Sequence, residues 1–302
     1  MTPPRQILAG QTFEVVSRCI SRLFLLAPSY EVQQTFLYLL GHYAKKHGIT
    51  LYALVLMANH YHLLGLDKHG NLPHFMRDLN SFVARVLNHH YGRDDKFWSG
   101  DGYHIVRPVN PEDVWARLMY ITSNPINADL VKRTEDYPGF VTTPGKIGRA
   151  ICVRRPAFFR EDGVMPETAE VVFEVPRCFE LSHDEYVARF DRELREAEFA
   201  AKRRRQASGK HVVGAEGLLR VSIDDRPRSK EAHGRTKGHI ACKCPTDRVA
   251  AIKARKAFLV EYQMCREEWR EDVAGVEFPP GTWWVCQFAG AGVRSEARGG
   301  PG

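Results

Sequence analysis

Residues 56–64 of the chain read Leu-Met-Ala-Asn-His-Tyr-His-Leu-Leu and lie where two apolar runs meet. The first run is Ile49–Met57 and the second is Tyr61–Leu66, and only two residues separate the first run from the histidine triplet. Two strand-like runs joined by so short a loop indicate an antiparallel hairpin. The stretch therefore predicts paired strands near the middle of an N-terminal domain.

His60 and His62 stand two residues apart on the second predicted strand. Side chains two apart on a strand point to the same face, so both imidazoles could bind one divalent metal ion. Two unrelated histidines on a half-buried strand are the simpler alternative, because such triplets often arise by chance.

Helices and further strands flank the hairpin on both sides. The predicted strands are Thr12–Cys19 and Tyr103–Val109, and the predicted helices are Ser29–His47, Leu72 to about Tyr91, and Asn110–Ser123. Their order along the chain is β-α-β-β-α-β-α. This order predicts an α+β fold in which helices cover one face of an antiparallel sheet.

Tyr120 lies away from the apolar face of the last predicted helix. At 100° per residue it is about 200° from Leu118, which belongs to that face. Asn124 follows one turn later. Two plainer alternatives remain open: Tyr120 is an ordinary exposed tyrosine, and Asn124 caps a short helix that begins at Pro125.

Taken in order, these motifs resemble the single-tyrosine HUH transposases, and in particular the REP-associated tyrosine transposases. In that family a His-hydrophobic-His strand precedes a helix with a Tyr-x-x-x-Asn-Pro motif, matched here by residues 56–64 and Tyr120–Val131. Residues 97–100 (Phe-Trp-Ser-Gly) and 136–138 (Asp-Tyr-Pro) match two further motifs. The resemblance covers roughly residues 8–140.

The resemblance implies a ferredoxin-like fold, with His60, His62 and Asn124 as metal ligands and Tyr120 as the nucleophile. Two imidazoles and an amide oxygen suit Mg²⁺ or Mn²⁺. The implied activity is that of a DNA transposase, a metal-dependent enzyme that cuts and transfers single-stranded or hairpin DNA. It would do so through a 5′-phosphotyrosine intermediate.

The net charge of +7 favours a polyanionic partner such as nucleic acid. Residues 201–270 contain 18 Lys/Arg and 8 Asp/Glu, a net of +10, so the rest of the chain carries about −3. The densest basic run within residues 201–270 is Lys202, Arg203, Arg204 and Arg205, and we expect these residues to contact DNA phosphates. The alternative is a solvated helix end.

We expect three parts: the transposase domain at 8–140, a basic and mainly helical extension at 141–288, and a disordered tail at 289–302. In the extension, helices are predicted over Leu181–Arg205 and Arg248–Glu271, a linker over about 206–245, and a turn with a short aromatic strand over Phe278–Phe288. The resemblance does not reach this extension.

The basic extension also keeps a second function open, a non-catalytic DNA-binding regulator derived from such a transposase. Both a homodimer and a monomer are compatible with the sequence. The seven scattered cysteines form no disulfide framework and favour a reducing compartment. Without a signal-peptide pattern or an apolar stretch of about 18 residues, we expect a cytoplasmic, nucleoid-associated protein with no membrane contact.

Overall fold

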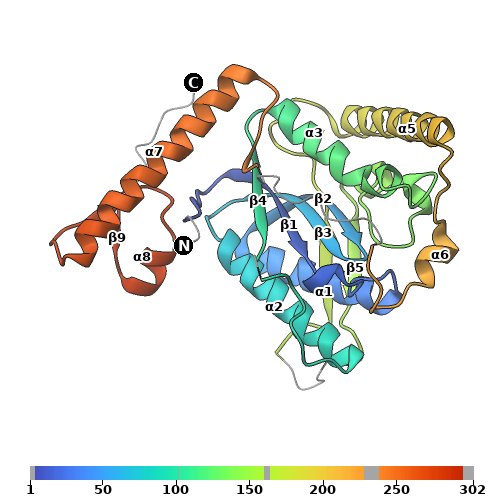
Figure 1. Cartoon of the computed structure of the whole chain (residues 1–302), viewed down its shortest axis with the longest axis horizontal. Helices are drawn as coiled ribbons and strands as arrows, with labels where there is room; N and C mark the ends of the chain where they lie inside the picture. Colours follow the sequence, from blue (N-terminus) through green and yellow to red (C-terminus); the bar gives the residue numbers. More distant parts are fainter. Residues whose placement is uncertain (1–3, 101, 160–163, 228–237, 295–302) are drawn as a thin grey trace.

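A five-stranded sheet forms the centre of the protein, which we describe from a computed structural model (Figure 1). The structure describes residues 4–100, 102–159, 164–227 and 238–294. The strands are β1 (Gln11–Arg18), β2 (Ile49–Met57), β3 (His60–Asp67), β4 (His104–Pro108) and β7 (Ile240–Ala241), in the order β2-β3-β1-β4-β7. The first four strands are antiparallel neighbours, and β7 joins β4 in parallel. The predicted hairpin is β2–β3, and the predicted α+β class is confirmed.

Helices α1 (Tyr30–His47) and α2 (Leu72–Tyr91) cover one face of this sheet. The Ser29 hydroxyl caps α1 by accepting a hydrogen bond from the amide of Val32, and Gly48 ends the helix with a φ of 70° that glycine adopts without strain. Tyr61 of β3 packs against α1 and donates a hydrogen bond to Asn80 of α2. The β1-α1-β2-β3-α2-β4 order on this sheet is the predicted ferredoxin-like arrangement.

Helix α3 (Pro111–Thr122) lies on the opposite face of the sheet (Figure 1). Its Tyr120 contacts His62, the neighbour of Tyr61 on β3, and successive side chains on a strand point to opposite faces. The expectation that helices share one face therefore holds for α1 and α2 and needs correction for α3. The apolar stripe of α3 packs on the sheet, so both faces are buried.

The hydrophobic core continues past residue 140. A hairpin of β5 (Ala150–Arg154) and β6 (Thr168–Val172) packs against α1, and α5 (His183–Ser208) packs against α3 through residues such as Phe190. A single cluster of buried residues extends from Ile7 to Leu218. The first part of the extension thus helps to hold the sheet and α3 in place, while the domain boundaries remain predictions.

The rest of the extension is built around α7 (Pro245–Arg270), a long helix that projects from the body at the β4 edge (Figure 1). The remaining short elements are η1 (Ile20–Arg22), α4 (Asn124–Asn127), η2 (Thr134–Asp136), η3 (Pro144–Lys146), α6 (Ala215–Leu219), β8 (Glu277–Phe278), α8 (Trp284–Ala289) and β9 (Gly292–Val293). Residues 228–237 of the predicted linker and 295–302 of the predicted tail lie outside the described residues.

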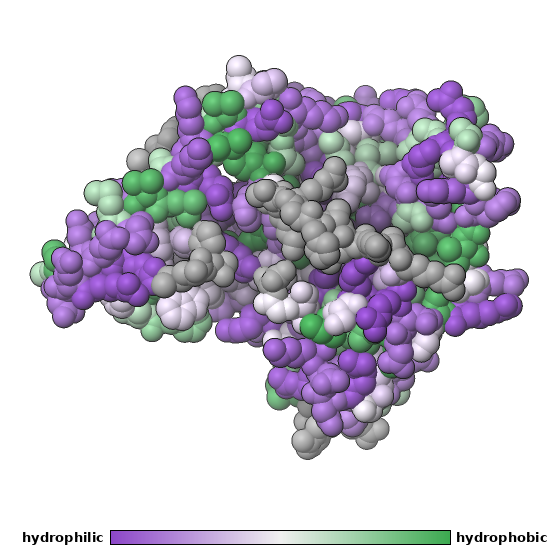
Figure 2. All heavy atoms as spheres, viewed as in Figure 1, coloured by the Kyte–Doolittle hydropathy of each residue, from purple (hydrophilic) through white to green (hydrophobic). Residues whose placement is uncertain are grey.

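The surface of the molecule mixes hydrophilic and apolar side chains, and α7 exposes both kinds (Figure 2). Val260 and Met264 are exposed on α7 beside several charged residues. In the part of the chain that the structure describes, no helix combines the length and apolar character needed to cross a membrane.

Candidate active site

The two histidines of the triplet lie together on the α3 face of the sheet. The centres of the His60 and His62 rings are 5.1 Å apart. His62 is buried at 6 % exposure and His60 is half-buried. The hairpin thus brings two imidazoles to one position, as the strand spacing predicts, on the face away from α1 and α2.

Each histidine uses its Nδ1 atom for a hydrogen bond. His62 Nδ1 donates to Glu14 Oε1 at 2.8 Å, and His60 Nδ1 donates to Asn59 Oδ1 at 2.6 Å, in the tautomers that these acceptors require. Both Nε2 atoms therefore keep a free lone pair. A carboxylate behind a ligand histidine orients the ring and makes it a better metal ligand. The geometry suits two metal-binding imidazoles.

The charge state of His60 also suits metal binding. Burial lowers its pKa well below the usual value, and the electrostatic effect of its neighbours His62, Arg18 and Arg22 lowers it further. The ring is therefore neutral at pH 7, and only a neutral imidazole can offer its lone pair to a metal ion.

Tyr120 stands beside these histidines on α3. Its ring centre is 5.5 Å from that of His62, in an edge-to-face arrangement, and its side chain is 45 % exposed. The start of α3 fixes this position, because Asn110 and Asp113 form a capping box there and Pro111 begins the helix. Tyr120 is thus both next to the histidines and open to a large ligand.

Arg117 and Glu14 complete the cluster, and the sequence reasoning missed both. The fully buried carboxylate of Glu14 accepts hydrogen bonds from His62 and from Arg117 Nε. Burial alone would raise the pKa of Glu14, but the hydrogen bonds from His62 and Arg117 and the charge of Arg117 hold it below its ordinary value. The Arg117 guanidinium also lies over the Tyr120 ring, 4.3 Å from its centre.

A signal for these residues was present in the sequence. Arg117 precedes Tyr120 by three residues, so the two share a face of the helix. Glu14 is a charged residue inside an apolar strand, which is costly unless a buried partner neutralises it. Both patterns indicate a buried ion pair, although neither identifies the partner.

Asn124 is the first residue of α4, and only Ser123 separates it from the end of α3. Ser123 separates the two helices with φ −86° and ψ 1°, a bend that fits the missing amide hydrogen of Pro125. Asn124 remains one turn beyond Tyr120, and its side chain forms no hydrogen bond with the residues that the structure describes. Its amide oxygen is therefore available, and its role as a ligand remains a prediction.

A donor set made of the two imidazoles and the Asn124 amide oxygen would suit a divalent ion of the magnesium or manganese kind. It would leave room for water or phosphate oxygens to complete the coordination. Within residues 4–100, 102–159, 164–227 and 238–294, no group of three or more His, Cys, Asp or Glu side chains could hold a metal ion. The candidate set depends on the amide of Asn124 as its third member.

The two further motifs support the strands that carry the histidines. Trp98 donates a hydrogen bond from Nε1 to the Asn80 carbonyl at 2.8 Å and packs against Tyr61. Tyr137 donates a hydrogen bond to the Leu56 carbonyl at 2.9 Å. Both contacts fix the hairpin close to the histidine triplet.

The basic run at the end of α5 divides into two pairs. Arg204 and Arg205 bind α4 and the residues just after it: both donate to the Ile126 carbonyl within α4 and approach Asp129 beyond its end, and Arg205 is only 6 % exposed. Lys202 and Arg203 are exposed. Arg204 and Arg205 therefore attach α5 to the body, and only Lys202 and Arg203 are fully open to a DNA phosphate.

Comparison with known proteins finds a family match for part of the chain. Residues 10–121, which carry His60, His62 and Tyr120, match the family model described as "Transposase IS200 like". This match confirms the predicted resemblance for that part of the chain and supports a transposase. No protein of curated function matches the chain.

Two solved structures are similar over part of the chain. A REP-associated tyrosine transposase bound to a REP hairpin shares 18% identity, with 46% of this chain and 81% of that chain covered and a TM-score of 0.40. A protein described as a candidate transposase from Deinococcus radiodurans R1 shares 21% identity, with 41% and 97% covered and a TM-score of 0.29.

Proposed function

We propose that this protein cuts and transfers single-stranded or hairpin DNA, with Tyr120 as the nucleophile and a divalent metal ion held by His60, His62 and Asn124. The observation that carries the proposal is the contact between His62 and Tyr120, whose ring centres are 5.5 Å apart. The free Nε2 atoms of both histidines and the exposure of Tyr120 support it.

In the proposed step, the Tyr120 oxygen attacks the phosphorus of a phosphodiester and forms a new P–O bond. The bond from phosphorus to the 3′ oxygen breaks, the phenol proton is released, and the leaving oxygen takes up a proton to give a 3′-hydroxyl. A bound Mg²⁺ or Mn²⁺ would polarise the phosphate and offset its negative charge. The resulting 5′-phosphotyrosine ester lets the strand be rejoined, which hydrolysis would not.

Arg117 and Glu14 have separate parts in this proposal. The Arg117 guanidinium lies over the Tyr120 ring, 4.3 Å from its centre, and places a positive charge beside the proposed nucleophile and the phosphate that it would attack. Glu14 is a positioning residue, because it binds both Arg117 and His62 and touches no reacting atom. Glu14 and Arg117 thus connect Tyr120, the proposed nucleophile, to His62, a proposed metal ligand.

The test is incubation with single-stranded and hairpin oligonucleotides in Mn²⁺, followed by denaturing electrophoresis. We expect a covalent protein–DNA adduct from the wild type and from the control Tyr30→Phe, an exposed tyrosine at the start of α1. Tyr120→Phe should form at least about 1,000-fold less adduct, since Tyr120 is the tyrosine in contact with His62 among the residues that the structure describes. Equal products from Tyr120→Phe and wild type, without an adduct, would refute the tyrosine mechanism.

A DNA-binding regulator without catalysis is the second candidate, supported by the net +10 charge of residues 201–270. DNA binding that depends on salt but is insensitive to EDTA and to His60→Ala, together with no cleavage, would favour the regulator. A homodimer and a monomer remain equally compatible with either function, and sedimentation in the presence and absence of DNA would distinguish them.

A further inference from the structure

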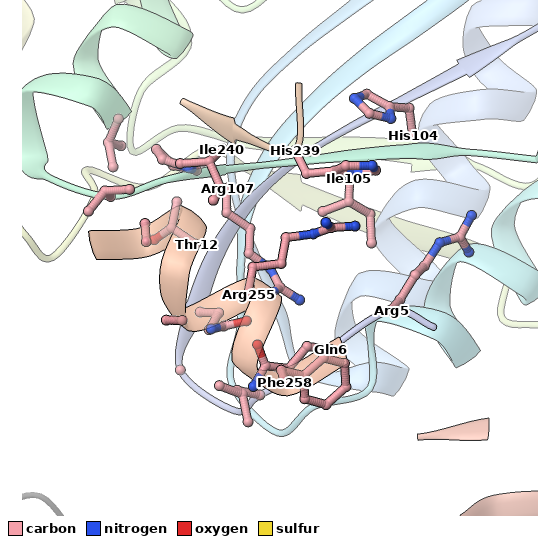
Figure 3. A pocket seen from close by; sticks show the side chains of 18 of the residues that line it. Arg5, Gln6, Thr12, His104, Ile105, Arg107, His239, Ile240, Arg255 and Phe258 are labelled. Atoms are coloured by element: carbon pink, nitrogen blue, oxygen red, sulfur yellow. The ribbon is translucent and has the colours of Figure 1, made fainter. Parts of the chain in front are cut away.

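A second candidate site lies at the β4 edge of the sheet, where the N-terminal segment, β4, β7 and α7 surround a cleft of about 940 Å³ (Figure 3). The start of α3 forms part of its lining through Asn110, Pro111 and Val114. Helix α7 lies outside residues 10–121, the part that matches the transposase family. We refer to this space as the basic cleft.

The charged residues that line the basic cleft are all cationic or potentially cationic. They are Arg5 from the N-terminal segment, His104 and Arg107 from β4, His239 beside β7, and Arg255 from α7. Of the described residues that line the cleft, none is Asp or Glu. A concave surface with one sign of charge and low-dielectric walls concentrates ions of the opposite sign.

Arg107 and Arg255 are the arginines of the basic cleft whose side chains have no partner among the described residues. Neither guanidinium forms an ion pair or a hydrogen bond with any residue that the structure describes, and both residues are half-buried. Burial and the charge of Arg255 lower the pKa of Arg107 to about 10, so it is still charged at pH 7. Two close guanidinium groups destabilise each other until an anion lies between them.

One carboxylate that shares a small cavity with Arg107 is occupied by other hydrogen bonds. Asp67 lies with Arg107 around a small neighbouring cavity. Its oxygens accept hydrogen bonds from the amides of His69, Asn71 and Leu72, at the start of α2. Asp67 therefore stabilises a helix end and does not neutralise Arg107.

The walls of the basic cleft are largely apolar. They include Tyr103, Ile105, Ile240 and Phe258, and the Arg5 guanidinium stacks on Tyr103 at 4.0 Å from the ring centre. Proteins that bind unpaired nucleic acid place cations against the phosphates and apolar or aromatic side chains against the bases. The basic cleft offers both. A duplex keeps its bases inside and presents phosphates on a convex surface, so it cannot use such walls.

We propose that the basic cleft binds a single-stranded segment of DNA, with Arg107 and Arg255 on its phosphates and the apolar walls against its bases. The proposal rests on the proposed function, because it gives the same DNA a second binding site beside the site of cleavage.

The position of the cleft relative to Tyr120 supports this assignment. Helix α3 lines the cleft at Pro111 and carries Tyr120 nine residues later, a distance of about 14 Å at 1.5 Å per residue. Along the sheet, His104 is in register with Val16 and Val16 with His62, so the His104 and His62 backbones are about 10 Å apart. One short stretch of DNA can therefore reach both sites.

The experiment measures fluorescence anisotropy of a labelled single-stranded oligonucleotide in EDTA, in a Tyr120→Phe background. No chemistry occurs under these conditions, so failure of the cleft and failure of the tyrosine mechanism remain distinguishable. The variants are Arg107→Gln and Arg255→Gln, with Arg248→Gln as the matched control. Arg248 is an exposed arginine of the same helix α7 that does not line the cleft.

We expect each cleft variant to weaken single-strand binding about 5- to 20-fold, and to reduce the slope of log affinity against log salt by about 0.7. Arg248→Gln should stay within about 2-fold of the wild type. Thermal unfolding would confirm that Arg107→Gln is folded. Arg255 lies on helix α7 and not in the central sheet, so Arg255→Gln tests the cleft with less risk to the fold.

Two results would overturn the proposal. If both cleft variants lose no more affinity than Arg248→Gln, the basic cleft does not hold DNA. If a fully paired duplex loses as much affinity as the single strand in the same variants, the cleft contacts phosphates of any DNA and the single-strand assignment is wrong.

Discussion

The arginines of the candidate active site and of α5 differ from those of the basic cleft in their partners. Arg117 is bound to Glu14, and Arg204 and Arg205 approach Asp129. Arg107 and Arg255 have no carboxylate among the residues that the structure describes. The difference shows that a count of basic residues does not locate a binding surface, since a paired arginine stabilises the fold and an unpaired one is available to a ligand.

Glu14→Gln should have the largest effect, because it removes the carboxylate that Arg117 and His62 share. Breaking a buried ion pair from one side costs about 3 kcal/mol of the free energy of unfolding. Loss of the carboxylate behind His62 should also weaken Mn²⁺ binding about 10- to 100-fold. Chemical denaturation and isothermal titration calorimetry measure the two effects.

Glu196→Gln is the control for this variant, since Glu196 is an exposed glutamate of α5. It should change the free energy of unfolding by less than about 0.5 kcal/mol. A Glu14→Gln protein as stable as the wild type, with unchanged Mn²⁺ affinity, would contradict a structural and positioning role for the pair.

Arg205→Met should have the second largest effect, and on stability alone. The buried guanidinium binds the Ile126 carbonyl and approaches Asp129, so its loss should lower the free energy of unfolding by about 2 kcal/mol. The exposed Arg203→Met should change it by less than about 0.5 kcal/mol. A loss of single-strand affinity in folded Arg205→Met would show that this arginine contacts DNA after all.

The pH dependence of stability at Asp78 tests whether cations paired with a carboxylate stabilise the fold. Burial would raise the pKa of Asp78, but hydrogen bonds from Lys46, Arg77 and His47 lower it to about 2. Because the folded pKa lies below the unfolded one, the stabilisation is complete above about pH 4 and is lost as the pH falls towards 2.

Asp78→Asn should therefore lower the free energy of unfolding by about 1 to 2 kcal/mol at pH 7, and the difference from wild type should shrink as the pH falls below 4. Urea denaturation at a series of pH values measures it. A difference that stays constant down to pH 2 would mean that the ion pairs of Asp78 contribute nothing.

The sequence predicted the elements that carry strong local signals. The predicted helices Ser29–His47, Leu72 to about Tyr91 and Leu181–Arg205 are confirmed to within a few residues, and in the structure Ser29 and Ser182 cap the first and the last of them. Periodicity also placed Tyr120 off its apolar stripe, and it is exposed beside His62. Such features depend on neighbours along the chain, and a sequence displays these directly.

Features that depend on contacts between distant segments could not be predicted in this way. The β5–β6 hairpin was missed, because its short strands are ordered by packing on α1. The predicted aromatic strand near residue 284 is wrong: Trp284 begins the short helix α8. The basic cleft combines residues 5, 107 and 255, and no local pattern connects them.

The length of α3 has a consequence for where such an enzyme would cut. One end of this helix borders the basic cleft and the other presents Tyr120, so under the two proposals the helix would set the distance between a bound phosphate and the broken bond. The number of nucleotides between the two would then be set by turns of α3 rather than by base sequence. Lengthening the helix by one turn, about 5.4 Å, would move the cut along the strand by one or two nucleotides.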